Sequence, residues 1–135
     1  MDKRILCIDD EKDVHDILIK MVTAWGYDIE CAGTRVEAFE MFDAMEPFLV
    51  ITDLRLTDQA YVDGVTIADR LHRQSPMTIF IALSGWVEPD SFELGYLLGS
   101  VFTDVLQKPI NQEVLKSVMD YAWEKRQRWE AILNG

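Results

Sequence analysis

Acidic, hydroxyl and lysine side chains follow four short apolar stretches of the chain, and together they form a set that can transfer a phosphoryl group. Asp9 and Asp10 follow the first apolar stretch, Asp53 follows the third, Ser84 the fourth and Lys108 the fifth. If these stretches are strands of one parallel sheet, their carboxyl ends lie along a common edge, where such sheets bind ligands. We therefore expect the five side chains to lie close together.

Three carboxylates at one edge repel each other and raise one another's pKa unless a cation neutralises them. A hard cation with oxygen ligands resolves this conflict, and Mg²⁺ (or Mn²⁺) commonly takes one or two carboxylates together with a phosphate. The Lys108 ammonium and the Ser84 hydroxyl add hydrogen-bond donors for phosphoryl oxygens. The set therefore predicts phosphoryl transfer to one of the carboxylates.

Each of these motifs has an ordinary structural explanation when it is taken alone. Acidic residues after a strand often stabilise the N-terminus of a helix, and a single Asp often belongs to a turn. Ser-Gly and Lys-Pro are common loop dipeptides. The functional interpretation depends on the joint order, in which all four motifs follow different predicted strands.

Five apolar stretches alternate with helical patterns, which predicts an α/β fold with a parallel sheet covered on both faces. The predicted strands are residues 5–8, 27–32, 48–51, 79–83 and 102–106. Apolar residues at three- and four-residue spacing predict helices within 14–25, 36–45, 65–73 and 89–99, and a fifth from Asn111 almost to the end of the chain. Asn111 is a favourable N-cap residue for that helix.

The composition predicts one soluble, cytoplasmic domain. The chain has 135 residues, of which 49% are hydrophobic, enough for a single core. Its formal net charge of −11 argues against nucleic-acid partners and anionic membranes, since both are bound by clustered Lys and Arg. The sequence has no stretch typical of a membrane span or a signal peptide. Cys7 and Cys31 are predicted to be reduced core thiols.

From residue 5 to about residue 122, the sequence closely resembles the receiver domain of two-component response regulators. The matching motifs are Ile8-Asp9-Asp10-Glu11, Ile51-Thr52-Asp53-Leu54, Asp63-Gly64, Ala82-Leu83-Ser84-Gly85 and Lys108-Pro109. The resemblance implies a flavodoxin-like, doubly wound sheet of five parallel strands in the order 2-1-3-4-5, an order for which receiver domains are a standard example. It also implies a signalling domain of a phosphorelay rather than an enzyme in the usual sense.

The resemblance further implies how the metal site is built. Asp10 and Asp53 would bind Mg²⁺ together with the backbone carbonyl of Arg55, and Asp9 would act through a water molecule. Asp53 would be the residue that accepts the phosphoryl group.

The phosphoryl donor implied by the resemblance is a phosphohistidine on a sensor histidine kinase or a histidine phosphotransfer protein. Ser84 and Lys108 would contact the phosphoryl oxygens, and the Lys108–Pro109 bond would be cis. The domain would also assist its own dephosphorylation.

The sequence departs from the family pattern around this site. Leu56-Thr57 replaces the usual Met-Pro, and the loop that follows is longer by about three residues. Val105 stands at the switch position that usually holds Tyr or Phe, so an aromatic switch cannot operate. The side chains of Arg55 and Trp86, each two residues after a predicted site residue, would flank the approach of water and control the lifetime of the phosphate.

The chain divides into a receiver domain at residues 1–122 and an extension of the last helix at 123–135. Trp123, Trp129, Ile132 and Leu133 continue the helical apolar pattern, and they are expected to extend past the sheet without an intramolecular partner. Such a stripe is typical of an interface. It predicts a homodimer through this helix, or a signalling helix that leads to an output domain.

Two other functions are consistent with some of these residues. A receiver-like interaction module that works without phosphate would account for Val105 and the altered loop. A haloacid-dehalogenase-type phosphohydrolase also uses a strand-end Asp, Mg²⁺ and Lys. That family has Asp-x-Asp after its first strand, whereas this chain has adjacent Asp9 and Asp10 and no room for a cap domain.

Overall fold

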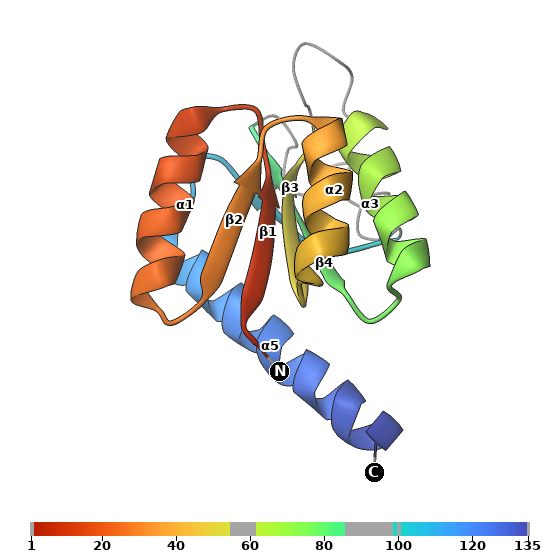
Figure 1. Ribbon diagram of the computed structural model, residues 1–135. Coiled ribbons are helices and arrows are strands. Elements are labelled where there is room, and N and C mark those ends of the chain that lie inside the picture. The colour runs from red at the N-terminus through yellow and green to blue at the C-terminus, as the bar shows by residue number, and fades with distance from the viewer. Residues whose placement is uncertain (1, 55–61, 86–98, 100, 135) are drawn as a thin grey trace.

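The fold is a five-stranded parallel sheet, as predicted from the apolar stretches. The computed structural model describes residues 2–54, 62–85, 99 and 101–134. The strands are β1 (Arg4–Ile8), β2 (Asp28–Ala32), β3 (Leu49–Asp53), β4 (Ile79–Ser84) and β5 (Phe102–Gln107). All neighbours in the sheet are parallel, and the strand order is β2-β1-β3-β4-β5 (Figure 1). The predicted strand order is therefore confirmed.

Four helices of the described residues connect or follow these strands. They are α1 (Lys12–Ala24), α2 (Arg35–Met45), α3 (Val62–Gln74) and α5 (Gln112–Asn134). None of these described helices has the length and apolar character needed to cross a membrane. Of the helix predicted within 89–99, residues 89–98 lie outside the described residues.

Local signals in the sequence account for several helix ends. Gly26 follows α1 with a φ of 90°, a left-handed conformation that glycine adopts without strain. Thr34 caps α2, where its side chain accepts a hydrogen bond from the backbone N–H of Glu37. Asn111 caps α5 as predicted, because its Oδ1 accepts a hydrogen bond of 3.0 Å from the backbone N–H of Val114.

The helices cover both faces of the sheet and form two apolar layers. Alternating residues of β1 divide between the layers, with Ile5 facing α1 and α5 and Leu6 facing α2 and α3. The strands β1, β3 and β4 are buried along almost their whole length, as expected for a parallel sheet covered on both faces. Burial of each Leu or Ile stabilises the fold by roughly 1.5–3 kcal/mol. These layers hold the carboxyl ends of β1, β3, β4 and β5 at one edge.

Helix α5 extends past the sheet, but the expectation that its two tryptophans have no intramolecular partner is wrong. The ring of Trp123 packs edge-on against Phe48, with 5.0 Å between ring centroids. Trp129 is partly buried against the same apolar layer. Arg126 donates a hydrogen bond of 3.1 Å to the backbone carbonyl of Met77 before β4. The extension therefore contacts the segments that precede β3 and β4, and the end of α5 projects below the sheet (Figure 1).

Candidate functional site

Lys108 joins two acidic residues at the carboxyl edge of the sheet. Its Nζ donates to Oδ2 of Asp9 at 2.9 Å and to Oδ2 of Asp53 at 3.1 Å. Asp9 follows β1, Asp53 ends β3 and Lys108 follows β5, so three strands position the three side chains. Both carboxylates are buried, and the side chain of Lys108 is only 17% exposed. The ammonium is held in place by its bonds to the carboxylates.

Two further carboxylates complete an acidic cluster around this lysine. Asp9, Asp10, Glu11 and Asp53 each offer a carboxylate oxygen, and these oxygens all lie within 4.8 Å of one another. Asp10 and Glu11 are exposed, whereas Asp9 and Asp53 are buried. The cluster is therefore open to solvent on one side and closed on the other, which allows a cation and a ligand to enter.

Burial and neighbouring charges shift the pKa values of Asp9 and Lys108. Burial raises the pKa of Asp9, although its hydrogen bonds with the Glu11 N–H and Lys108 act in the opposite direction. Burial alone would lower the pKa of Lys108, but its contacts with Asp9 and Asp53 outweigh burial and raise it. Within the part of the chain that the structure describes, the ammonium of Lys108 lies among four carboxylates. A hard divalent cation with oxygen ligands, such as Mg²⁺, fits this donor set.

Glu11 belongs to the cluster and does not serve as a helix cap. It occupies the N-cap position of α1, but its side chain makes no capping hydrogen bond. Its Oε1 instead lies 3.4 Å from Nζ of Lys108, while its backbone N–H donates to Oδ1 of Asp9 at 2.8 Å. The side chain of Glu11 therefore does not cap the N-terminus of α1, which was the ordinary structural explanation for these acidic residues. Glu11 directly follows Asp10 in the sequence, but its role in the cluster was not predicted from the sequence.

Ser84 lies next to Lys108 through the pairing of β4 with β5. It is fully buried at the end of β4, and its backbone carbonyl accepts a hydrogen bond of 2.8 Å from the Lys108 N–H. The Lys108–Pro109 peptide bond is cis, as the family resemblance implies. The structure thus brings Ser84 to the same edge as Asp53, the end of the neighbouring strand β3.

Gly64 of α3 allows the backbone that carries Asp53 to pass close to a helix. A Cβ atom at Gly64 would lie 2.3 Å from the backbone oxygen of Asp53 and 2.7 Å from Cα of Leu54. The Gly64 N–H also donates a hydrogen bond of 3.2 Å to the Leu54 carbonyl. Only glycine fits this approach, which explains the residue after Asp63 in the sequence motif.

Three residues predicted to modulate the site have different outcomes. Arg55 and Trp86 lie outside the described residues. Val105 lies in β5 opposite Ala82, and its side chain is partly buried against the layer formed with α2 and α3. A valine at this place packs into the layer and offers no ring that could rotate between two positions.

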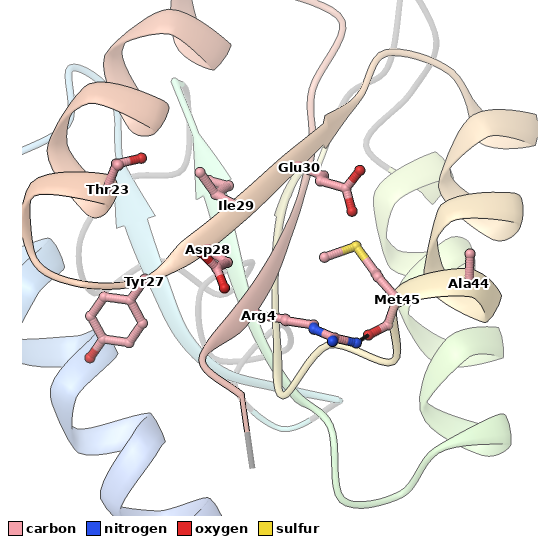
Figure 2. A pocket seen from close by; sticks show the side chains of 8 residues that line it. All are labelled: Arg4, Thr23, Tyr27, Asp28, Ile29, Glu30, Ala44 and Met45. Atoms are coloured by element: carbon pink, nitrogen blue, oxygen red, sulfur yellow. Dashed lines mark hydrogen bonds between the residues drawn. The ribbon is translucent and has the colours of Figure 1, made fainter.

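A hollow of about 480 Å³ lies at the opposite end of β1, far from the acidic cluster along that strand. It is lined by residues at the starts of β1 and β2 and at the ends of α1 and α2, namely Arg4, Thr23, Tyr27, Asp28, Ile29, Glu30, Ala44 and Met45. Figure 2 shows Arg4 directed toward Met45, whose carbonyl accepts its hydrogen bond at 3.1 Å. Arg4 also pairs with Asp2. The guanidinium of Arg4 already has these partners, so it is not available to bind a ligand in the hollow.

The raised pKa of Asp9 leads to a prediction about stability and pH. Between the ordinary pKa of Asp, about 4, and its raised value, the folded chain holds a proton that the unfolded chain has lost. The contribution of Asp9 to the free energy of unfolding therefore falls as pH rises through that window. Asn does not titrate, so Asp9→Asn should not lose this contribution. In EDTA, the free energy of unfolding of the variant minus that of the wild type should therefore increase as pH rises from about 4 to 7.

Urea unfolding at a series of pH values measures this difference. Asp43→Asn, at an exposed position of α2, is the matched control and should show no such gain. A difference between Asp9→Asn and wild type that does not change with pH would contradict the prediction.

Comparisons with known proteins agree with this fold. Residues 5–120 match the family model of the response regulator receiver domain. A similar structure is the CheY-like receiver domain protein of Methanospirillum hungatei JF-1, with a TM-score of 0.79, 23% identity and coverage of 95% of this chain and 99% of that one. Another is the signal receiver domain of an HD domain-containing protein of Pseudomonas fluorescens Pf-5, with a TM-score of 0.82, 23% identity and coverage of 96% and 93%.

Two longer proteins show sequence similarity to the chain. The sensor protein TorS of Escherichia coli (strain K12) is 31% identical over 117 residues, which are 86% of this chain and 12% of TorS. The alkaline phosphatase synthesis transcriptional regulatory protein PhoP of Bacillus subtilis (strain 168) is 29% identical over 111 residues, which are 82% of this chain and 44% of PhoP. The chain therefore spans less than half the length of either relative. Because the family model matches residues 5–120, most of its length, the chain belongs to the response regulator receiver domain family.

Proposed function

We propose that this receiver domain accepts a phosphoryl group on Asp53 from a phosphohistidine of a sensor histidine kinase or a histidine phosphotransfer protein. The observation that carries the proposal is the position of the Lys108 ammonium, 3.1 Å from the Asp53 carboxylate and bonded also to Asp9. This ammonium can stabilise negative charge that builds up on a phosphoryl group at Asp53. A buried Asp, an anchored lysine and a solvent-exposed acidic side make an acceptor site rather than a purely structural ion pair.

The transfer exchanges one bond to phosphorus for another. An oxygen of the Asp53 carboxylate forms a P–O bond while the P–N bond of the phosphohistidine breaks. The leaving imidazole nitrogen keeps the electron pair of the broken bond and takes a proton from solvent. Ser84 and Lys108, both at this edge, would hold the phosphoryl oxygens during the exchange. Attack of water on the acyl phosphate then returns Asp53 and inorganic phosphate.

Receiver domains bind Mg²⁺ at an acidic pocket, and the acidic cluster of this chain offers the matching donors. Asp10 and Asp53 would bind Mg²⁺ (or Mn²⁺) with the backbone carbonyl of Arg55, and Asp9 would contribute through water. When bound, the cation neutralises charge on the carboxylates and on the incoming phosphoryl group. Without it, a phosphoryl group would approach an excess of negative charge.

Labelling by acetyl phosphate tests the proposed function. With Mg²⁺, intact-mass spectrometry should show one added phosphoryl group per chain, and EDTA should abolish the addition. A folded chain that takes no phosphoryl group with Mg²⁺ would favour the interaction module that works without phosphate. Continuous release of phosphate from a generic phosphoester would instead favour the phosphohydrolase.

The similarity to part of TorS, which is named as a sensor protein, supports a partner within a kinase pathway. The chain would act in the cytoplasm with its phosphodonor, and it would bind neither nucleic acid nor membrane. The side chains of Arg55 and Trp86 would set the lifetime of the phosphate by limiting access of water. In this proposal the chain is a phosphorylated switch that assists its own transfer and dephosphorylation.

The last turn of α5 is proposed to contact a second copy of the chain. Ile132 and Leu133 are 75% and 69% exposed, and with Trp129 they line an apolar hollow of about 290 Å³ next to Pro76 and Met77. The same helix carries residues of both signs, so two copies packed in opposite directions can pair Glu with Lys or Arg. Contact with a second copy would remove this apolar surface from water.

Replacement of both Ile132 and Leu133 by Glu should therefore convert a dimer into a monomer. Sedimentation velocity at high protein concentration, with and without beryllofluoride, measures the change. Val36→Glu, at a position that is 65% exposed on α2, is the control and should leave the dimer intact. A wild-type chain that sediments as a monomer under both conditions would disprove the dimer.

A further inference from the structure

Two cysteines and a histidine meet on the face of the sheet that α1 covers, next to Asp9 of the acidic cluster. Cys7 of β1 and Cys31 of β2 are register partners, so their side chains project from adjacent strands into the same layer. His15 is on α1. One ligand atom from each of the three residues lies within 4.8 Å of the others. Both cysteines are free thiols.

Packing alone usually explains a pair of cysteines on neighbouring strands, but here His15 adds a third side chain that can bind a metal. Cys7 is fully buried, whereas Cys31 and His15 are partly exposed, so the group can be reached from solvent. The two sulfur atoms and a ring nitrogen of His15 lie within 4.8 Å of one another, so the thiols share one site and do not fill separate gaps in the core.

The hydrogen bond of His15 matches the way in which metal-binding histidines are oriented. Its Nε2 lies 2.5 Å from the backbone carbonyl oxygen of Asp9. Since a carbonyl oxygen can only accept, Nε2 donates in this hydrogen bond, and Nδ1 is the nitrogen that would bind a metal. Histidines that bind metals commonly donate their other N–H to a backbone carbonyl, which fixes the ring and raises its basicity.

The separations are close to those of a tetrahedral thiolate and imidazole site. Zn–S and Zn–N bonds of about 2.3 and 2.0 Å place the ligand atoms about 3.5–3.8 Å apart. Shifts of about 1 Å would bring atoms now within 4.8 Å to that spacing. Two thiolates also cancel the charge of a divalent cation, which suits a partly buried site.

We propose that Cys7, His15 and Cys31 form a binding site for Zn²⁺, with water as the fourth ligand. Binding breaks two S–H bonds and forms two Zn–S bonds, and both protons leave to solvent. The zinc stays divalent, and His15 contributes a lone pair without losing a proton. Mg²⁺ does not compete, because it prefers oxygen ligands. The proposal does not depend on phosphorylation of Asp53.

Co²⁺ reports on this site directly, because thiolate ligands produce a charge-transfer band that oxygen ligands do not. The full chain is reduced with a phosphine, freed of metal, and supplied with excess Mg²⁺ to occupy the acidic cluster. One equivalent of Co²⁺ should then produce the thiolate charge-transfer band and the intense visible bands of a tetrahedral complex. One equivalent of Zn²⁺ should remove both, and native mass spectrometry should show one Zn²⁺ in place of two protons.

Substitutions separate this site from adventitious binding. Removing a residue that only supports a metal ligand weakens metal binding by about 10–100-fold. Cys31→Ser removes a ligand itself, so it should weaken Zn²⁺ binding at least about 100-fold. Cys31 is on the edge strand β2 and partly exposed, so this variant should fold, and circular dichroism checks that it does. His15→Gln should weaken binding and alter the visible bands, whereas the control His72→Gln on α3 should change neither. Absence of the charge-transfer band in the reduced wild type, or its survival in Cys31→Ser, would overturn the proposal.

Discussion

Replacing Asp53 with asparagine is expected to reduce phosphoryl incorporation from one group per chain to background. The Asp53 carboxylate ends β3, is bonded to Lys108 at 3.1 Å and belongs to the acidic cluster. An amide has nearly the same shape, so the fold and the neighbouring side chains should be retained. It lacks the nucleophilic oxygen that forms the P–O bond. Intact-mass spectrometry after incubation with acetyl phosphate and Mg²⁺ measures the loss.

Asp69→Asn is the matched control for this experiment. Asp69 is an exposed acid of α3 that pairs with Arg73, away from the acidic edge, and its replacement should leave labelling unchanged. Peptide mapping of the labelled wild type should place the group on the segment that contains Asp53. Full labelling of Asp53→Asn would show that another residue is the acceptor.

Gly64→Ala is expected to destabilise the chain and to slow labelling of Asp53. The added Cβ would lie 2.3 Å from the Asp53 backbone oxygen and 2.7 Å from Leu54 Cα, so α3 and β3 would have to separate. Overpacking of this kind costs about 1–3 kcal/mol, occasionally more, because the neighbours are backbone atoms that cannot rotate away. Alanine gains about 1 kcal/mol over glycine in a helix interior, which is too little to offset the clash. The free energy of unfolding in urea should therefore fall.

Gly85→Ala provides the comparison for stability, because a Cβ at Gly85 would meet no atom of the described residues within 4 Å. That variant should unfold at nearly the urea concentration of the wild type. If Gly64→Ala were as stable as Gly85→Ala, the close approach of α3 to β3 would not constrain this position.

The sequence by itself determined the strands, their order along the chain and the residues that follow them. The stretches around Ile5, Leu49 and Ile79 are apolar without alternation, and this pattern arises because both faces of a parallel strand are buried. Asn111 predicted the start of α5 because capping depends on a residue and its nearest neighbours alone. Features of this kind are local in sequence, so the sequence suffices to predict them.

The sequence also predicted that Asp9, Asp53 and Lys108 lie at one edge, since strand ends in a parallel sheet share an edge. It could not specify that Lys108 bonds to both acids, because that depends on side-chain directions from three separate strands. The role of Glu11 at this edge was missed for the same reason. Its position in the sequence suits a helix cap, and only the place of Lys108 shows that its carboxylate serves elsewhere.

Contacts between distant segments were decided by the tertiary structure alone. Nothing in the helical pattern of α5 shows that Trp123 packs against Phe48, because the contact depends on where the sheet ends relative to the helix. The same holds for Gly64 beneath Asp53, and for His15, which reaches the Asp9 carbonyl from the first turns of α1. Periodicity reports which face of an element is buried but not what it is buried against. Packing of elements that are far apart in sequence supplies that second piece of information.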